Sequence, residues 1–348
     1  MSKVYVSTVT YNNETTIGKA IESILNQTHT DWEYHITNNA STDKTGKIIE
    51  EYAQKDSRIK TYHNDKNSRE LNELLAIQKN YMHNLKEDEY FCWLDGDDEY
   101  ESNFMEDTLS YAKENNLDIV ITGTEQLDSK TGEHLRYVNV SNFIADENNF
   151  TDFFVSAAMS ISHVWGILYN HRAASNYTLD NNDFTGGGGD AYVIWNTIDA
   201  SDRIGFLDGS YYKYYVNPHS QAKKSFNLIR LESSGKINDK VRDVISKKVA
   251  VLSEPLENTL TNLFVHHLNY SVYVLYESDL SIVRKIEGVT KVLFNKRFQQ
   301  AIESSHDKTN AKNILNYCSK ILGQGQKVIK GKSIDKAIKR YLQLNKMC

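Results

Sequence analysis

The chain has 348 residues, of which 40 are basic and 46 acidic, so its net charge is −6. This balance argues against a dedicated nucleic-acid-binding protein, which usually has a basic excess. With 40% hydrophobic and 25% charged residues, the composition is that of a globular protein, and the length predicts two domains. Three scattered cysteines argue against a disulfide framework or zinc cluster. Without a signal-peptide pattern or a long apolar run, we expect a cytoplasmic location.

The first half of the chain alternates strand-like and helix-like segments. Short β-rich runs predict strands at residues 4–9, 33–37, 58–62, 90–94 and 118–122. Apolar residues at helical spacing lie between them, most clearly at Ile17, Ala20, Ile21, Ile24 and Leu25. This alternation predicts an α/β fold with a mostly parallel, Rossmann-like sheet flanked by helices.

Polar clusters follow three of these strands, at residues 8–13, 38–43 and 95–98. Ligands bind beyond the carboxyl ends of parallel strands, so we expect these clusters to form one site. The last cluster places three carboxylates directly after an apolar strand, where they repel one another unless water or a cation offsets their charge. Oxygen ligands suit Mg²⁺ or Mn²⁺, and we favour a metal site over a solvated acidic turn.

From about residue 226 the pattern is helical. Residues 321–348 contain seven basic residues and one acidic residue, a net charge of +6 against −12 for the remainder. This basic end fits peripheral attachment at the inner membrane face, a docking surface for a protein partner, or a solvated face that closes a helical bundle. The last two interpretations are favoured.

The order of the segments 8–12, 24–28, 41–43 and 94–98 resembles that of a family 2 glycosyltransferase. The resemblance covers about residues 1–222 and implies a GT-A fold. It also implies inverting transfer of a hexose or N-acetylhexosamine from a UDP-sugar to a hydroxyl of a glycan or glycoprotein. We therefore expect a GT-A domain at 1–225 and a helical domain at 226–348, which would hold the acceptor, a partner or a second subunit of a homo-oligomer.

The resemblance also assigns nucleotide contacts. Thr8 and Tyr11 follow the first strand, and Asn39 occupies the position of an acidic residue that meets the uracil ring. Asparagine is a departure, but its amide both donates and accepts, so it can still pair with a uracil edge. Lys79 resembles the arginine of an Arg-Asn pair, and Arg69 is a second cation near the same loop. Either could contact the base or diphosphate, or be a solvated surface residue.

Asp95 and Asp97 match the family's D-x-D element. By this resemblance Asp97 binds Mn²⁺ or Mg²⁺, while Asp95 and Gly96 contact the nucleotide sugar and Asp95 also serves as a metal ligand. The cation would stabilise the departing diphosphate. Asp190 resembles the catalytic base that takes the proton of the acceptor hydroxyl, although the glutamate that usually precedes it is here Gly189.

Other interpretations stay open for several residues. Asp190 could cap a helix over residues 191–198, a role that can coexist with catalysis. Trp165 and the tyrosines of 211–215 could stack on sugar faces or fill the core. His219 could touch the diphosphate or the metal, although a lone histidine is more often structural.

Two other classes of function compete with a glycosyltransferase. A non-catalytic, glycosyltransferase-like binding module that supports a partner enzyme would explain the departures at Asn39 and Gly189. A nucleotidyltransferase also combines an α/β sheet with metal-binding carboxylates. We rank it last, because the sequence has no glycine-rich phosphate loop near its start.

Overall fold

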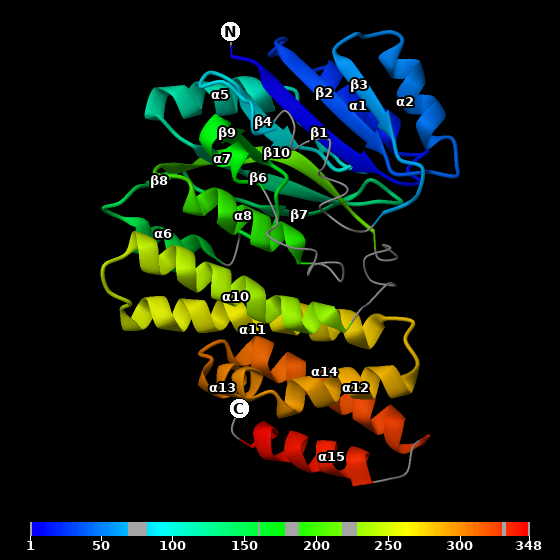
Figure 1. Cartoon of the computed structure of the whole chain (residues 1–348), viewed down its shortest axis with the longest axis vertical. Helices are drawn as coiled ribbons and strands as arrows, with labels where there is room; N and C mark the ends of the chain where they lie inside the picture. Colours follow the sequence, from blue (N-terminus) through cyan, green and yellow to red (C-terminus); the bar gives the residue numbers. More distant parts are fainter. Residues whose placement is uncertain are drawn as a thin grey trace. The chain divides into compact units, whose positions relative to one another are not determined.

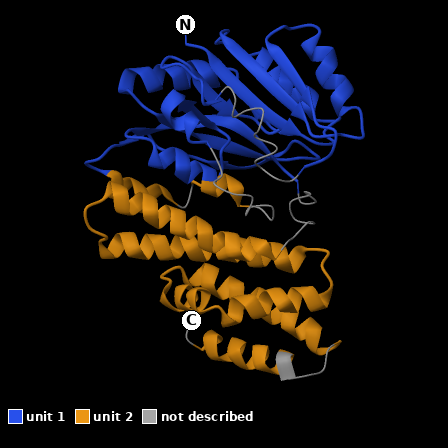
Figure 2. Ribbon diagram, in the orientation of Figure 1, with its two compact units in different colours: residues 1–149, 163–182, 193–218 blue, residues 150–162, 183–192, 219–348 orange. Residues whose placement is uncertain are grey.

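The computed structural model describes residues 2–68, 82–158, 161–177, 188–217, 228–328 and 332–346 (Figure 1). The chain divides into two compact units (Figure 2). Unit 1 comprises residues 1–149, 163–182 and 193–218, and unit 2 comprises residues 150–162, 183–192 and 219–348. Unit 2 thus combines two internal segments with the C-terminal helices. The simple division at residue 225 stays a prediction.

Unit 1 is built on a mixed sheet to which ten of the described strands belong. Eight of these strands follow the order β3-β2-β1-β4-β9-β6-β10-β5, while β7 pairs with β6 and β8 with β10. The bounds are β1 Val4–Thr10, β2 Trp32–Asn38, β3 Ile59–His63, β4 Tyr90–Trp93, β5 Glu99–Tyr100, β6 Ile119–Asp128, β7 His134–Val138, β8 Phe143–Ala145, β9 Ile167–Asn170 and β10 Ile204–Val216. The pairs β1·β2, β2·β3 and β1·β4 are parallel, whereas β9 is antiparallel to both β4 and β6. The predicted α/β class is therefore confirmed, and β9 makes the sheet mixed.

Helices pack beside this sheet because their apolar residues recur at helical spacing. In α1 (Ile17–Leu25), the side chains of Ile17, Ala20, Ile21 and Ile24 are all buried in the core of unit 1. The other helices of unit 1 are α2 Thr45–Ala53, α5 Phe104–Asn115 and α7 His171–Ser175, while α8 Gly189–Asp199 begins in unit 2 and continues in unit 1 from Val193. All four residues of β4 are buried, as expected for a strand covered on both faces.

The strand register brings the predicted polar clusters together. Thr10 at the end of β1 pairs with Asn38 at the end of β2, and Ser7 pairs with Trp93 at the end of β4. These three strands are parallel neighbours, so the loops that follow them leave the same edge of the sheet.

Unit 2 is helical, as predicted for the C-terminal part. Its helices are α6 Phe150–Ala157, α10 Ile229–Lys248, α11 Glu254–Glu277, α12 Ile282–Phe294, α13 Lys296–Ser304, α14 Lys308–Gln326 and α15 Lys332–Asn345. Ile334, Ala337 and Leu344 of α15 are buried in the core of this bundle. The apolar side of the basic C-terminal helix thus closes the bundle. Among the described helices, none combines the length and hydropathy needed to cross a bilayer.

Candidate active site

The acidic turn, which we define as Asp95–Asp98, is held by aromatic side chains. The indole nitrogen of Trp93 donates a hydrogen bond to Asp95 Oδ1 at 2.7 Å. The hydroxyl of Tyr212 accepts a hydrogen bond from the Asp95 backbone N–H at 3.3 Å and donates one to Asp98 Oδ2 at 2.9 Å. The backbone N–H of Tyr215 donates to Asp98 Oδ1 at 2.8 Å. Strand β10 therefore fixes the conformation of the turn.

The three carboxylates of the turn have different surroundings. Asp98 is buried, with 1% of its surface exposed, and burial together with the charges of Asp95 and Asp97 raises its pKa well above the usual range. Asp97 is solvent-accessible, yet the protein around its carboxyl group raises its pKa as well. Asp95 is half-buried. The turn thus concentrates negative charge that a bound cation would offset.

The donor set of the turn fits a divalent cation that also binds substrate. No group of three or more His, Cys, Asp or Glu side chains is arranged to hold a metal ion within the described part of the chain. Asp95 and Asp97 nevertheless supply carboxylate oxygens, while Asp98 is committed to Tyr212 and Tyr215. Mg²⁺ is commonly bound through one or two carboxylates plus water and substrate phosphates.

Gly96 allows the acidic turn to lie against the end of β1. A Cβ atom at this position would lie 2.6 Å from Thr10 Oγ1 and 3.0 Å from Thr10 Cβ. The carbonyl oxygen of Gly96 accepts a hydrogen bond from Thr16 Oγ1 at 3.1 Å, which ties the turn to the residue preceding α1. Only glycine fits this close approach without displacing Thr10.

Thr8 lies beneath the site rather than on its surface. Its side chain is fully buried, and its hydroxyl donates to the carbonyl oxygen of Leu94 at 2.5 Å and shares a hydrogen bond with the Tyr34 hydroxyl at 2.7 Å. A ligand cannot reach a fully buried side chain. We therefore correct the expected nucleotide contact: Thr8 ties β1 to the residue that precedes the acidic turn.

Tyr11 is half-buried and directly precedes Asn12, whose hydrogen bonds join the first polar cluster to the second. The backbone N–H of Asn12 donates to Ser41 Oγ at 3.0 Å, and Asn12 Oδ1 accepts from the backbone N–H of Thr42 at 2.8 Å. Asn12 and Ala40 adopt left-handed backbone conformations, with φ of 53° and 59°. Such strained residues cluster at ligand-binding loops, which fits a functional role for this edge.

The side-chain amide of Asn39 is saturated by protein groups. Its Nδ2 donates to Asn67 Oδ1 at 3.0 Å and to the carbonyl oxygen of Ser68 at 2.8 Å. Its Oδ1 accepts from Asn64 Nδ2 at 3.0 Å and from the backbone N–H of Ser68 at 3.1 Å. In this conformation Asn39 shapes the 64–68 loop, and its polar groups are not available to a uracil ring.

Trp165 belongs to an aromatic stack that the sequence did not reveal. Its ring stacks on His163 at 3.8 Å, on Tyr212 at 4.7 Å and on Tyr214 at 5.1 Å between centroids. His163 Nδ1 lies 3.0 Å from the Trp165 carbonyl oxygen, and burial lowers the pKa of His163 to about 4. The stack leads directly to Tyr212, which holds the acidic turn. A sugar contact by Trp165 stays a prediction.

Asp190 lies in the first turn of α8, whose first residue is Gly189. The carboxylate is therefore inside the helix rather than at the capping position, where a negative charge still interacts favourably with the helix dipole. Its side chain is solvent-accessible, but surrounding protein raises its pKa, and the positive charge of Arg230 opposes that rise. Gly188 has a φ of +92°, and a Cβ there would lie 3.1 Å from Ile237 Cδ1.

Three expected site residues, Arg69, Lys79 and His219, lie outside the described residues. Their assignments stay predictions.

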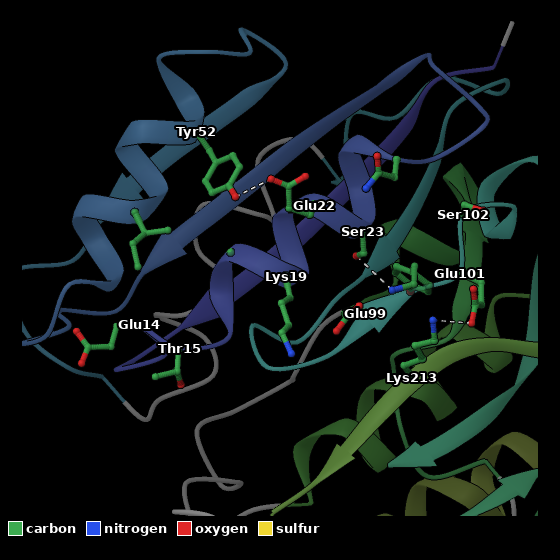
Figure 3. A pocket seen from close by; sticks show the side chains of 14 residues that line it. Glu14, Thr15, Lys19, Glu22, Ser23, Tyr52, Glu99, Glu101, Ser102 and Lys213 are labelled. Carbon is green, nitrogen blue, oxygen red and sulfur yellow. Dashed lines mark hydrogen bonds and ion pairs between the residues drawn. The ribbon is translucent and has the colours of Figure 1, made fainter. Parts of the chain in front are cut away.

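A pocket of about 540 Å³ opens beside α1 and β5 in unit 1 (Figure 3). Its charged groups pair largely with protein: Tyr52 donates to Glu22 Oε1 at 2.7 Å, and Lys213 Nζ lies 2.8 Å from Glu101 Oε1. None of the residues expected from the sequence to form the site lines this pocket. It therefore adds no group to the acidic turn.

Comparison with known proteins relates the N-terminal part of the chain to glycosyltransferases. The family model "Glycosyl transferase family 2" matches residues 5–170. This segment, which contains the acidic turn, is therefore similar to family 2 glycosyltransferases. The chain is 27% identical to the uncharacterized glycosyltransferase EpsJ of Bacillus subtilis over 212 residues. The matched segment is 60% of this chain and 60% of EpsJ. It is 30% identical to the putative teichuronic acid biosynthesis glycosyltransferase TuaG of the same species, over 34% of this chain and 46% of that protein.

Solved structures show the same fold. Residues 1–349 of S. aureus TarS, in complex with UDP-GlcNAc, superpose with a TM-score of 0.66 at 16% identity over 93% of this chain and 92% of that chain. The mannosyltransferase PcManGT of Pyrobaculum calidifontis, in complex with GDP-Man and Mn²⁺, gives a TM-score of 0.51 at 12% identity, covering 92% and 86%. The expected GT-A fold with a helical C-terminal region is thereby confirmed.

Proposed function

We propose that the protein is an inverting, metal-dependent glycosyltransferase. It moves a hexose or N-acetylhexosamine from a UDP-sugar to a hydroxyl group of a glycan or glycoprotein acceptor. The observation that carries this proposal is the acidic turn Asp95–Asp98, held at the carboxyl end of β4 beside the ends of β1 and β2. The binding of UDP-GlcNAc by TarS, a protein of the same fold, supports a UDP-sugar donor.

Asp97 and Asp95 would hold the divalent cation. When bound, such an ion acts as a Lewis acid on the diphosphate, whose negative charge grows as the sugar leaves. Hydrogen bonds within the protein fix the positions of these carboxylates: Trp93 orients Asp95, and Tyr212 together with Tyr215 holds Asp98. Nearby, Asn39 holds the 64–68 loop through hydrogen bonds to the carbonyl oxygen and from the backbone N–H of Ser68.

Asp190 takes the proton of the acceptor hydroxyl as that oxygen attacks the sugar. A carboxylate with a raised pKa is a stronger base than an ordinary aspartate, and the positive charge of Arg230 opposes the rise that burial causes. No glutamate precedes it, so the proton transfer rests on Asp190 alone among the residues proposed here.

The test measures UDP release from UDP-GlcNAc, UDP-glucose and UDP-galactose, with GDP-mannose as a comparison, in Mn²⁺, Mg²⁺ or EDTA. Asp97→Ala and Asp190→Asn should each lower turnover about 100-fold or more, since metal and general-base contributions are of that order. Asp88→Ala and Asp243→Asn change exposed aspartates elsewhere and serve as matched controls.

Near wild-type turnover of either active-site variant would refute the mechanism. Binding of UDP without turnover of any donor would instead favour the alternative of a non-catalytic binding module that supports a partner enzyme. Release of pyrophosphate would favour a nucleotidyltransferase. The cytoplasmic location stays a prediction that cell fractionation tests. The homo-oligomeric state stays a prediction that a measurement of the protein's size in solution tests.

A further inference from the structure

The last four helices carry a charge opposite to that of the remaining chain. Residues 282–348, which include α12 to α15, contain 15 basic and 4 acidic residues, a net charge of +11. The preceding 281 residues contain 25 basic and 42 acidic residues, a net charge of −17. Between Lys308 and Lys346 the sequence contains a single acidic residue, Asp335. Such an asymmetry creates a strong local positive potential within unit 2.

The outward side of α15 combines cations with an apolar side chain. Lys336, Lys339 and Lys346 are exposed, and Leu342 between them is 52% exposed. Leu342 follows Lys339 by three residues and precedes Lys346 by four, so these three side chains share one face of the helix. The opposite side of α15 is buried in the bundle, where α15 packs against α12 and α14 (Figure 1).

Helix α14 extends the same character. Lys312, Lys320 and Lys327 are exposed at spacings of eight and seven residues, which places them along one side of the helix. Val328, directly after the last of them, is 70% exposed. Helices α14 and α15 pack against each other, and we use the name basic face for their exposed residues together with the turn after α14: Lys312, Lys320, Lys327, Val328, Lys336, Lys339, Leu342 and Lys346.

Several cations of the basic face have no partner of opposite charge. Within the described residues, Lys312, Lys327, Lys339 and Lys346 form no ion pair. The fold therefore does not use these charges for its own stability, and their mutual repulsion works against the bundle. A negatively charged ligand would relieve that repulsion.

We propose that the basic face binds an anionic lipid surface. Clusters of lysines are drawn to the negative potential of anionic lipid headgroups. The exposed Leu342 and Val328 favour a bilayer over a soluble polyanion, because apolar side chains gain by entering the headgroup boundary and gain nothing from a hydrated polymer. Since the apolar side of α15 is buried in the bundle, the contact is peripheral: the lysines bind the headgroups, the side chains of Leu342 and Val328 enter the headgroup boundary, and the helix itself does not insert.

The test uses the full chain and vesicles of phosphatidylcholine with or without about 30 mol% phosphatidylglycerol, sedimented at about 50 mM and about 500 mM KCl. We expect binding only to the anionic vesicles at low salt. The triple variant Lys336→Glu, Lys339→Glu, Lys346→Glu should weaken it at least about tenfold. The matched control, Lys47→Glu, Lys55→Glu, Lys60→Glu, makes the same charge change on exposed residues around α2 and should bind as the wild type does.

A gentler variant, Leu342→Ser, keeps every charge and should weaken vesicle binding while leaving binding to soluble polyphosphate unchanged. Circular dichroism and thermal melting confirm that each variant is folded before its binding is scored. Absence of binding to anionic vesicles would overturn the proposal. So would equal loss in the control triple variant, or binding to polyphosphate with none to vesicles, which would point to an anionic polymer. Each outcome is independent of the proposed glycosyltransferase activity, which is read from UDP release.

Discussion

The variant Tyr212→Phe isolates the hydroxyl group that holds the acidic turn. Tyr212 is fully buried, and its hydroxyl joins the Asp95 backbone N–H to the carboxylate of Asp98. Phenylalanine keeps the ring, and with it the packing against Trp165 at 4.7 Å and Tyr100 at 5.1 Å between centroids. The substitution therefore opens no large cavity, and its effect reports the two hydrogen bonds alone.

The expected loss of stability follows from the burial of Asp98. A hydrogen bond contributes about 0.5–1.5 kcal/mol, and a buried partner that is left unsatisfied adds about 1–3 kcal/mol to the loss. Asp98 keeps its second bond, from the Tyr215 backbone N–H, so we expect a total loss of about 2–3 kcal/mol. Because the turn also orients the proposed metal ligands, the affinity for Mn²⁺ should fall about 10- to 100-fold.

Urea unfolding followed by tryptophan fluorescence measures the stability, and UDP release titrated with Mn²⁺ measures the metal affinity. Tyr169→Phe is the matched control, because the Tyr169 hydroxyl is also buried but donates to a neutral carbonyl, that of Val164, at 3.1 Å. That variant should lose about 1 kcal/mol and leave the Mn²⁺ dependence unchanged. If Tyr212→Phe matched this control in both measurements, the reasoning about the acidic turn would be wrong.

Three further predictions concern the site. Gly96→Ala brings a Cβ to 2.6 Å from Thr10 Oγ1, so it should cost about 1–3 kcal/mol in urea unfolding and lower UDP release; an unchanged midpoint would argue against the close approach. Because burial raises the pKa of Asp190, turnover should fall with decreasing pH through a pKa above that of an ordinary aspartate, and Arg230→Gln should move this limb of the pH–rate profile to higher pH, not lower. Burial lowers the pKa of His163 to about 4 in the folded protein, while the unfolded chain has the ordinary histidine pKa of about 6.5, so the unfolded state gains protons first and the free energy of unfolding decreases as the pH falls below about 6.5. Lowering the pH from about 7 to about 5 should therefore reduce the free energy of unfolding by about 2 kcal/mol, and His163→Phe should largely abolish this pH dependence.

Local sequence patterns predicted the framework of unit 1. The β-rich runs at 4–9, 33–37 and 90–94 became β1, β2 and β4, since each is bounded by polar turns and flanked by helical spacing. The polar clusters after these strands lie together because parallel neighbours end at one edge. The antiparallel placement of β9 between β4 and β6 was not predicted, because nothing local in residues 167–170 specifies it.

The sequence by itself determined which residues carry negative charge at the end of β4, because an apolar strand followed by Asp95, Asp97 and Asp98 is a local pattern. Only the tertiary structure decided how these carboxylates differ: Asp98 is committed to Tyr212 and Tyr215, more than a hundred residues away in the chain, while Asp97 stays accessible. It also decided that Asn39 is saturated and that Thr8 is buried. Burial and hydrogen-bond partners depend on contacts between distant segments, which no local pattern of residues encodes.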